Sequence, residues 1–257
     1  MLIALDVGNT HTVIGVYEDE RLLHHWRLHT STNRTTDEHG ALLSTMLESV
    51  GLHLPLKPEG VAVACVVPPL NQAMEQLARR YFQCEPLMVG PGIKTGMPIL
   101  YENPKEVGAD RIANAVAAYD RYNCACIVVD FGTATTFDYI TGRGEYAGGA
   151  IAPGLGIASE ALIERAAKLY RVELVRPREA VGRTTVAAIQ SGLIFGYTAL
   201  VDGMVERIRR ERGEKARVIG TGGIAELIAG ESKAIEEVDE FLTLKGLRLI
   251  FERNRRP

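Results

Sequence analysis

Apolar residues form an unbroken run at the start of the chain, and the run ends in a polar turn that contains glycine. Residues 2–5 are apolar, and Asp6-Val-Gly-Asn-Thr10 follows directly. A run without alternation predicts a strand that is covered on both faces, as in α/β proteins. Further strands are predicted over residues 12–17 and 22–28, separated by the polar turn at residues 18–20. The opening segment is therefore predicted to be a three-stranded meander.

Helical and strand patterns alternate in the segment that follows. Helices are predicted over residues 36–50, 70–81 and 109–119, and strands over residues 61–67 and 86–89. Residues 90–108, which join the strand at 86–89 to the helix at 109–119, are rich in Gly and Pro and have little periodicity. Long irregular segments inside compact domains often carry function, so this segment is a candidate site.

The opening pattern returns at residue 127. Superposing the two runs aligns four pairs of residues: Ile3 with Ile127, Asp6 with Asp130, Gly8 with Gly132 and Thr12 with Thr136. Strands predicted over residues 137–140 and 146–151 complete a second meander. An internal repeat of this kind indicates two related domains, which we place at residues 1–115 and 116–257.

The remainder of the chain is predicted to contain helices and short strands. Helices are expected over residues 157–169, 186–212, 224–229 and 244–251, and a strand begins at residue 217. That strand ends in the glycine turn Gly220-Thr-Gly-Gly223. The predicted fold class is therefore α/β, with two duplicated domains that are each built on a sheet.

Composition narrows the classes of function. The 257 residues carry a formal net charge of -3, which gives no electrostatic reason to expect a nucleic-acid partner. No stretch approaches the roughly 18 continuous apolar residues that a membrane span requires. The N-terminus has no basic segment or cleavage site, so a cytoplasmic protein is expected. The cysteines at 65, 124 and 126 lie in apolar segments and are predicted to pack as small hydrophobic residues.

The two Asp-Gly turns have the chemistry of a site for phosphate and its metal ion. Gly8 and Gly132 let a backbone N–H approach phosphate oxygens without a Cβ in the way. Asp6 and Asp130 supply carboxylates for a hard cation, which from the residues alone would be Mg²⁺ held through water. Further hydrogen bonds are available from Asn9, Thr10, Thr133 and Thr135. Asp-Gly is also common in plain turns, but two such turns in register favour phosphate binding.

The third glycine turn, Gly220–Gly223, suits the close approach of a nucleotide base or ribose. By itself it is equally consistent with a tight connection between a strand and a helix. The chain has neither the Gly-x-x-x-x-Gly-Lys-Ser/Thr phosphate loop nor a Gly-x-Gly-x-x-Gly pattern after its first strand. These absences argue against P-loop and Rossmann folds.

Six motifs together resemble the type III pantothenate kinases, within the superfamily of sugar kinases, actin and heat-shock chaperones. In chain order they are Asp6-Val-Gly-Asn-Thr10, Tyr101-Glu-Asn-Pro104, Gly108-Ala-Asp-Arg111, Asp130-Phe-Gly-Thr-Ala-Thr-Thr136, Gly148-Gly-Ala-Ile-Ala-Pro-Gly154 and Gly220-Thr-Gly-Gly223. The resemblance implies two ribonuclease H-like (actin-like ATPase) domains, each with a central mixed sheet, and an interdomain cleft. It also implies ATP-dependent phosphorylation of pantothenate to 4'-phosphopantothenate, the first step of coenzyme A biosynthesis, by a homodimer.

The resemblance assigns roles to individual residues. Asp110 would be the general base, and Asp130 would hold a monovalent cation, K⁺ or NH₄⁺, whereas Asp6 keeps the Mg²⁺ role. Substrate would be bound by Tyr101, Gly108, Ala109, Asp110, Arg111 and Thr185. ATP and its phosphates would be bound by Asp6, Val7, Gly8, Asn9, Thr10, His11, Thr12, Val13, Gly132, Thr133, Gly220, Gly222 and Gly223. The chain departs from the family at Thr184, where an Asn is usual.

Several alternatives stay open at this point. Asp110 is also placed to cap a helix, and Arg111 to form a structural ion pair. The acceptor would differ in another small-molecule kinase of the same fold, because one fold supports many substrates. A non-catalytic regulatory homologue is a further alternative, against which the acidic residues at 6, 110 and 130 argue.

Overall fold

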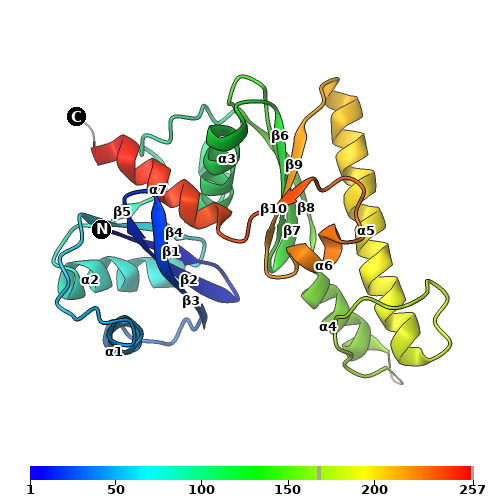
Figure 1. The fold of residues 1–257 in the computed structure, drawn as a ribbon, viewed down its shortest axis with the longest axis horizontal. Coiled ribbons are helices and arrows are strands. Elements are labelled where there is room, and N and C mark those ends of the chain that lie inside the picture. Colours follow the sequence, from blue (N-terminus) through cyan, green and yellow to red (C-terminus); the bar gives the residue numbers. More distant parts are fainter. Residues whose placement is uncertain (167–168, 256–257) are drawn as a thin grey trace. The chain divides into compact units, whose positions relative to one another are not determined.

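The computed structural model describes residues 1–166 and 169–255, which fold into two compact units. The first unit consists of Met1–Ala117 together with the chain from Leu242 onward, and the second consists of Ala118–Phe241. Each unit is built on its own five-stranded sheet, with helices packed on it (Figure 1).

The sheet of the first unit has the strand order β3-β2-β1-β4-β5. Its strands are β1 (Leu2–Val7), β2 (His11–Glu18), β3 (Arg21–His29), β4 (Gly60–Cys65) and β5 (Leu87–Met88). The central strand β1 pairs antiparallel with β2 and parallel with β4, so the sheet is mixed. The predicted opening meander is present as β1, β2 and β3.

Helices cover both faces of this sheet. They are α1 (Thr36–Glu48), α2 (Asn71–Tyr81) and α7 (Leu242–Arg255). Helix α3 (Ala109–Tyr122) packs against α7, and short 3₁₀ turns lie at Pro68–Leu70 and Pro104–Glu106. Ile3 and Leu5 of β1 are buried in one core cluster with Leu43 of α1 and Met74 of α2. Neighbouring strand residues point to the opposite face, where Leu244 of α7 approaches Gly15 of β2. Burial on both faces explains why β1 has no polar alternation.

The sheet of the second unit has the order β10-β9-β6-β7-β8. Its strands are β6 (Cys126–Phe131), β7 (Ala134–Ile140), β8 (Tyr146–Pro153), β9 (Arg217–Gly222) and β10 (Glu237–Val238), and its helices are α4 (Leu155–Arg165), α5 (Thr185–Arg212) and α6 (Ala225–Ala229). In the described part of the chain, α5 alone is long and apolar enough to cross a membrane by length and composition. Its buried residues Ile189, Ile194 and Val201 belong to the core cluster of this sheet.

The two sheets have matching topologies. In each, an antiparallel meander supplies the central strand and its neighbours on one side, and two parallel strands extend the sheet on the other side. This confirms the predicted α/β fold with two duplicated halves and a mixed sheet in each. The duplication follows from the sequence repeat because similar apolar strands with similar turns form similar pairings.

The structure differs from the sequence-based expectations mainly in two helices. The short strand β10 falls in the stretch where small helices and strands were expected without stated bounds. Helix α4 begins at Leu155 and ends at Arg165, whereas the helix was expected over residues 157–169; residues 167–168 of that range lie outside the described part of the chain. Helix α7 was assigned to the second domain, 116–257, but it belongs to the first compact unit.

Long-range packing accounts for the position of α7. Its residues Leu244, Leu247 and Ile250 are buried, and Gly246 lies directly against the backbone of Ala113 in α3. Contacts between residues so far apart leave no local trace in a sequence. The domain division at residue 115 stays a prediction, although the compact units divide close to it, after Ala117.

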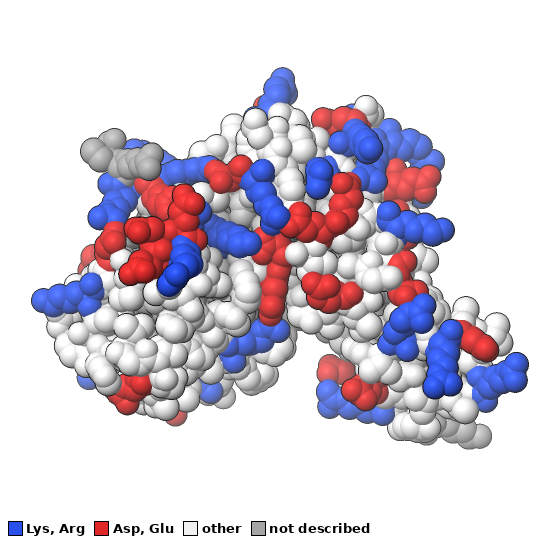
Figure 2. Space-filling view, in the orientation of Figure 1, with Lys and Arg blue, Asp and Glu red and all other residues white. Residues whose placement is uncertain are grey.

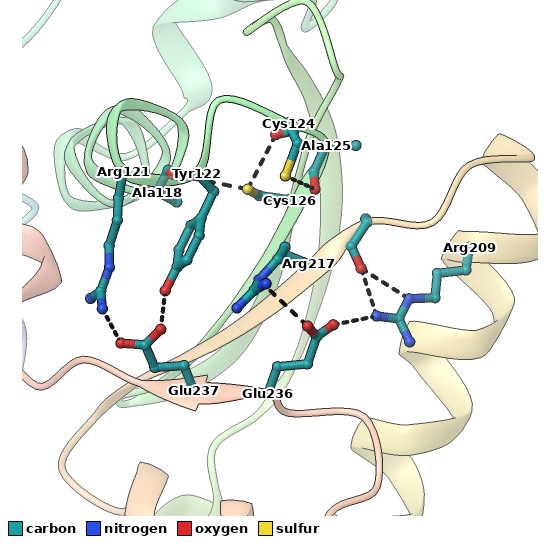
Figure 3. Close-up of polar contacts among 11 residues, drawn as sticks. Ala118, Arg121, Tyr122, Cys124, Ala125, Cys126, Arg209, Arg217, Glu236 and Glu237 are labelled. Atoms are coloured by element: carbon teal, nitrogen blue, oxygen red, sulfur yellow. Dashed lines mark hydrogen bonds and ion pairs between the residues drawn. The ribbon is translucent and has the colours of Figure 1, made fainter.

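A polar network in the second unit links the end of α3 to β9, β10 and α5 (Figure 3). Arg121 and Tyr122 of α3 both donate to the carboxylate of Glu237. The neighbouring Glu236 accepts from Arg209 at 2.9 Å and pairs with Arg217 at 3.4 Å. Burial and the hydrogen bond to Glu237 raise the pKa of Tyr122, which keeps its hydroxyl protonated as a donor.

This network generates a prediction for the two tyrosines near the end of α3. Tyr122→Phe removes a hydrogen bond to a carboxylate and is expected to lower the free energy of unfolding by about 1 kcal/mol. Tyr119→Phe is the matched control, because its hydroxyl only reaches Gly142 O at 3.4 Å; it is expected to cost less than about 0.5 kcal/mol. Denaturant titration followed by circular dichroism measures both. Equal losses would contradict the role of the Glu237 contact.

Candidate functional site

The first candidate turn joins β1 to β2, and the amide of Gly8 closes it by donating to His11 O at 3.0 Å. A Cβ at Gly8 would stand 3.1 Å from that carbonyl oxygen, which is tight for any side chain. Asp6 lies just before the turn, in register with Val13 on β2 and with Ala64 on β4. Its carboxylate is therefore attached to the central strand of the sheet, next to the turn.

Thr30, at the end of β3, holds this turn in place. Its amide donates to Thr10 O at 2.9 Å and its hydroxyl donates to Gly8 O at 2.7 Å. The same hydroxyl lies 2.9 Å from that of Thr12. Thr30 was not among the predicted site residues. The signal that could have found it is its position directly after the third strand of the meander.

The start of α3 meets the first turn at the carboxyl ends of β1 and β4. Val66 follows β4, and its amide donates to Val7 O at 3.0 Å. A Cβ at Gly108 would lie 3.4 Å from Val66 Cγ1, in ordinary contact. The structure therefore brings the predicted phosphate segment, residues 6–13, next to the predicted substrate segment, residues 108–111. Active sites of α/β sheets commonly lie at the carboxyl ends of strands.

Asp110 lies in the first turn of α3, where its Oδ1 accepts a hydrogen bond from the amide of Arg111 at 2.7 Å. Negative charge is stabilised at a helix N-terminus, so this position favours the ionised carboxylate. A Cβ at Gly108 would collide with that carboxylate oxygen, so glycine leaves space for it. Asp110 and Tyr101 are both half-buried, and Arg111 is buried. Tyr101 lies in the irregular segment before α3.

The second candidate turn joins β6 to β7. The amide of Gly132 donates to Ala134 O at 3.0 Å, and the amide of Gly154 donates to Thr133 O at 3.2 Å. A Cβ at Gly154 would lie 2.6 Å from Gly132 O, so only glycine allows the chain after β8 to approach the turn this closely. Gly154 thus holds the second turn as Thr30 holds the first.

The second turn is one residue shorter than the first, which corrects the predicted alignment of Thr12 with Thr136. The strand registers pair Val7 with Thr12 in the first unit and Phe131 with Thr135 in the second. Thr135 therefore has the position in the second unit that Thr12 has in the first. Its buried hydroxyl has no hydrogen-bond partner among the described residues, because Gly154 has no hydroxyl to replace that of Thr30.

The third glycine turn lies at the end of β9, beside the second Asp turn. Phe131 and Gly222 are in parallel register, and Gly222 has a positive φ of 94°. A Cβ there would meet Phe131 O at 2.6 Å and Asp130 Oδ1 at 2.8 Å. Gly220, in contrast, has only side-chain neighbours at 3.4 Å or more. The structure thus brings Asp130, Gly132, Thr133 and the Gly220–Gly223 turn together.

Two side chains near the first turn have shifted pKa values. Burial, with smaller effects from Arg27 and His29, lowers the pKa of His11, so its imidazole is neutral at pH 7. Burial raises the pKa of the Cys65 thiol, and the Asp6 carboxylate raises it further. Cys65 is therefore an unreactive thiol at neutral pH. Within the described residues all four cysteines are free, and Cys126 is fully buried.

Thr185 lies at the start of α5, in the second unit. It lines a groove of about 490 Å³ in the second unit, together with residues of α4 and α5 such as Leu162 and Leu193. The preceding Thr184 is the N-cap of α5, and its hydroxyl accepts a hydrogen bond from the amide of Ala187 at 3.1 Å. Asn and Thr both serve as N-caps, so the replacement of the usual Asn keeps the local structure.

The donor groups at the two Asp turns fit a metal ion that is bound mainly by its substrate. Among the described residues, no group of three or more His, Cys, Asp or Glu is placed to hold a metal ion. Asp6 and Asp130 each provide one carboxylate beside a glycine turn. Mg²⁺ is commonly held in this way, by one or two carboxylates with water and phosphate oxygens as the other ligands.

Comparisons with known proteins show which proteins this chain is similar to. The family model of the type III pantothenate kinases matches residues 2–207. A type III pantothenate kinase from Anaeromyxobacter sp. (strain K) is 57% identical over 255 residues, which cover 99% of this chain and 100% of that protein.

Two solved structures share the fold at lower identity. One, described as a Baf family transcriptional activator from Campylobacter jejuni, is 18% identical with a TM-score of 0.62, and the match covers 99% of this chain and 100% of that one. The other, an archaeal actin homologue, is 14% identical with a TM-score of 0.55 over 98% of this chain and 99% of that one. At such identities the likeness concerns the fold alone.

Gly220 and Gly222 of β9 belong to the same sequence motif, but their surroundings in the structure differ. Gly222→Ala is expected to weaken ATP binding about tenfold or more, because its Cβ would force Phe131 and Asp130 to move and its φ would be strained. Gly220→Ala, with only ordinary contacts around its Cβ, is the control and should bind ATP within about twofold of the wild type. Isothermal titration calorimetry measures both affinities. Equal losses would show that the positive φ at Gly222 is unimportant.

Proposed function

The chain belongs to the type III pantothenate kinase family, and from this membership we propose roles for its residues in the family's reaction. The protein is an enzyme that uses ATP, with a divalent metal ion, to phosphorylate pantothenate in coenzyme A biosynthesis. The observation that carries the proposed roles is the contact between the start of α3 and the first Asp turn, through Val66.

Asp110 acts as the general base in the proposed mechanism. Its carboxylate takes the proton from the primary hydroxyl of pantothenate while the hydroxyl oxygen attacks the γ-phosphorus of ATP. The bond from that phosphorus to the bridging oxygen breaks, and ADP leaves with its electrons. Phosphoryl transfer passes through a loose transition state, so the position of Asp110 matters more than its basicity. The helix N-terminus that holds it favours its negative charge.

The first Asp turn binds phosphate in this proposal. The backbone amides of residues 8–13 approach the phosphate oxygens, and the neutral imidazole of His11 adds no charge. Asp6 orients the water shell of Mg²⁺, and a bound Mg²⁺ neutralises negative charge on the phosphates. The second turn contributes Thr133 and Gly132, and Gly222 leaves space for ATP beside β9.

Asp130 holds a monovalent cation, K⁺ or NH₄⁺, in this proposal. The second turn differs from the first in length and in its neighbours, which supports different ions at the two carboxylates. The nearby Gly222 leaves Asp130 Oδ1 uncovered by a side chain at that position. A carboxylate oxygen is a suitable ligand for a hard cation of single charge.

The acceptor contacts Tyr101, the segment from Gly108 to Arg111, and Thr185. Arg111 supplies a guanidinium for the carboxylate of pantothenate, since a planar fork of donors matches a carboxylate. Tyr101 adds an aromatic surface from the irregular segment before α3. Thr185 contributes a hydroxyl from the α4–α5 groove.

We also propose that the enzyme is a homodimer formed through the second unit. Large apolar side chains are exposed there on the chain between residues 151 and 181, which is unusual for a surface that stays in water. They are Ile151, Ile157, Leu162, Tyr170, Val175 and Val181. Helices α4 and α5 and the segment between them would form the interface.

The remaining expectations concern the location of the enzyme in the cell and its macromolecular partners. We propose a cytoplasmic enzyme, where its four free thiols would stay reduced. Neither a nucleic acid nor a membrane is proposed as a partner. Positive and negative side chains are intermingled on the face in Figure 2, and the formal net charge is -3.

The decisive variant is Asp110→Asn, which keeps the size of the side chain and removes the base. We expect turnover to fall by about 10²-fold or more while ATP affinity stays within a few-fold. The measurement is ADP release from ATP with pantothenate, in K⁺, NH₄⁺ and a salt of an inert cation. Asp120→Asn, an exposed position on the same helix, is the matched control and should keep wild-type turnover. Wild-type turnover in Asp110→Asn would reduce Asp110 to a helix cap.

The proposed dimer is tested by charge insertion into the apolar surface. Val181 is 78% exposed, and Val181→Asp is expected to shift the protein from dimer to monomer in analytical ultracentrifugation. A buried charge at an interface costs several kcal/mol, which is enough to dissociate a typical dimer. Leu100→Asp, at a 54% exposed position of the first unit, is the control that should stay dimeric. A wild-type protein that sediments as a monomer would overturn the proposal.

A further inference from the structure

A fully buried carboxylate lies on β7, outside every role assigned so far. Asp138 has no exposed surface. Its Oδ1 accepts a hydrogen bond from the hydroxyl of Tyr146 at 2.6 Å, and its Oδ2 accepts one from the hydroxyl of Thr136 at 3.1 Å. Burying an ionisable group is costly. We therefore expect the Asp138 carboxylate to have a role in addition to packing.

The strand register connects this carboxylate to the second Asp turn. Asp130 of β6 is directly opposite Thr136 of β7, and Val128 is opposite Asp138. Directly opposed residues have their Cβ atoms about 4.5–5.5 Å apart on the same face of the sheet. Residues two apart on one strand share a face as well. Asp130, Thr136 and Asp138 thus follow one another along one face of the sheet.

Asp138 determines which way the Thr136 hydroxyl points. The Thr136 hydroxyl donates to Asp138 Oδ2, and a hydroxyl has a single proton to donate. Because the proton of Thr136 is directed to Asp138, the lone pairs of Thr136 Oγ1 are left for the Asp130 side. A hydroxyl held in this way offers an oxygen ligand to a cation and no donor to a phosphate.

The first unit supplies an internal comparison. In its sheet Asp6 is opposite Val13, and Ala4 is opposite Gly15. Val13 and Gly15 therefore occupy the places that Thr136 and Asp138 occupy in the second unit. Leu244 and Leu22 pack near Gly15, so that position is apolar. The duplicated sheet thus forms without the polar pair, which belongs to what distinguishes the Asp130 turn from the Asp6 turn.

We propose that Asp138 is a positioning residue that holds Thr136 Oγ1 as a second oxygen ligand, beside Asp130, for a monovalent cation. This inference rests on the proposed cation role of Asp130. Oxygen ligands suit hard cations. Thr136 is the residue that touches the ion, and Asp138 acts through it. A purely structural Asp138 would satisfy the hydroxyls of Tyr146 and Thr136 and have no influence on cation binding.

The test compares thermal stability of the full chain in KCl with that in tetramethylammonium chloride at equal ionic strength, with Mg-ATP and without pantothenate. A cation that binds the native state raises the melting temperature. The variants are Thr136→Val, which reproduces the residue of the first unit, and Asp138→Asn. Both are expected to lose the K⁺-specific rise in Tm and to need at least about tenfold more K⁺ for half-maximal ADP release.

Tyr146→Phe is the control, because it removes a different donor to Asp138 and leaves Thr136 in place. It should lower Tm equally in both salts and keep the K⁺-specific rise. If Asp138→Asn does not fold, Thr136→Val decides alone.

The outcomes separate this inference from the proposal that it rests on. A wild-type protein with no K⁺-specific change in Tm or in ADP release would overturn both. A wild-type response that Thr136→Val retains in full would overturn the inference alone and leave Asp130 as the cation ligand.

Discussion

The structure depends on how the two central strands, β1 and β6, end. Both strands are buried on both faces. Each central strand reaches an aspartate and then folds back through a glycine whose amide bonds to the next strand, at 3.0 Å in both units. A buried backbone has to pair its polar groups, so the fold closes the turn by itself. The carboxylate just before each glycine is thereby kept at the end of a rigid strand. Binding chemistry on rigid elements is more precise than on loops.

The duplicated halves then diverge around this shared constraint. The first turn is one residue longer and is held by the Thr30 hydroxyl, whereas the second is held by the backbone of Gly154. The face beside Asp6 is apolar, with Gly15, and the face beside Asp130 carries the buried Asp138. Two equivalent turns thus acquire different neighbours without any change of topology. In the proposed roles, these differences accompany a divalent ion at Asp6 and a monovalent ion at Asp130.

Most of the candidate residues could be located from the sequence because their signals are local. Asp6, Asp130 and their glycines stand directly after apolar runs, and Asp110 stands at the start of a periodic helix. The residues that hold these groups could not be predicted, since their partners are distant in the chain: Thr30 lies 22 residues from Gly8. The shorter second turn was also missed, because an alignment without gaps pairs Thr12 with Thr136.

By itself, the sequence determined the strands, the duplication and the family, since apolar periodicity and short motifs are properties of neighbouring residues. Only the tertiary structure decided that α7 packs with the first unit, against Ala113. It alone distinguished Gly222, pressed on Asp130, from the permissive Gly220. The physical reason is common to these cases. Strand register and helix packing bring together atoms from separate segments, and the steric fit between these atoms depends on all of the segments at once.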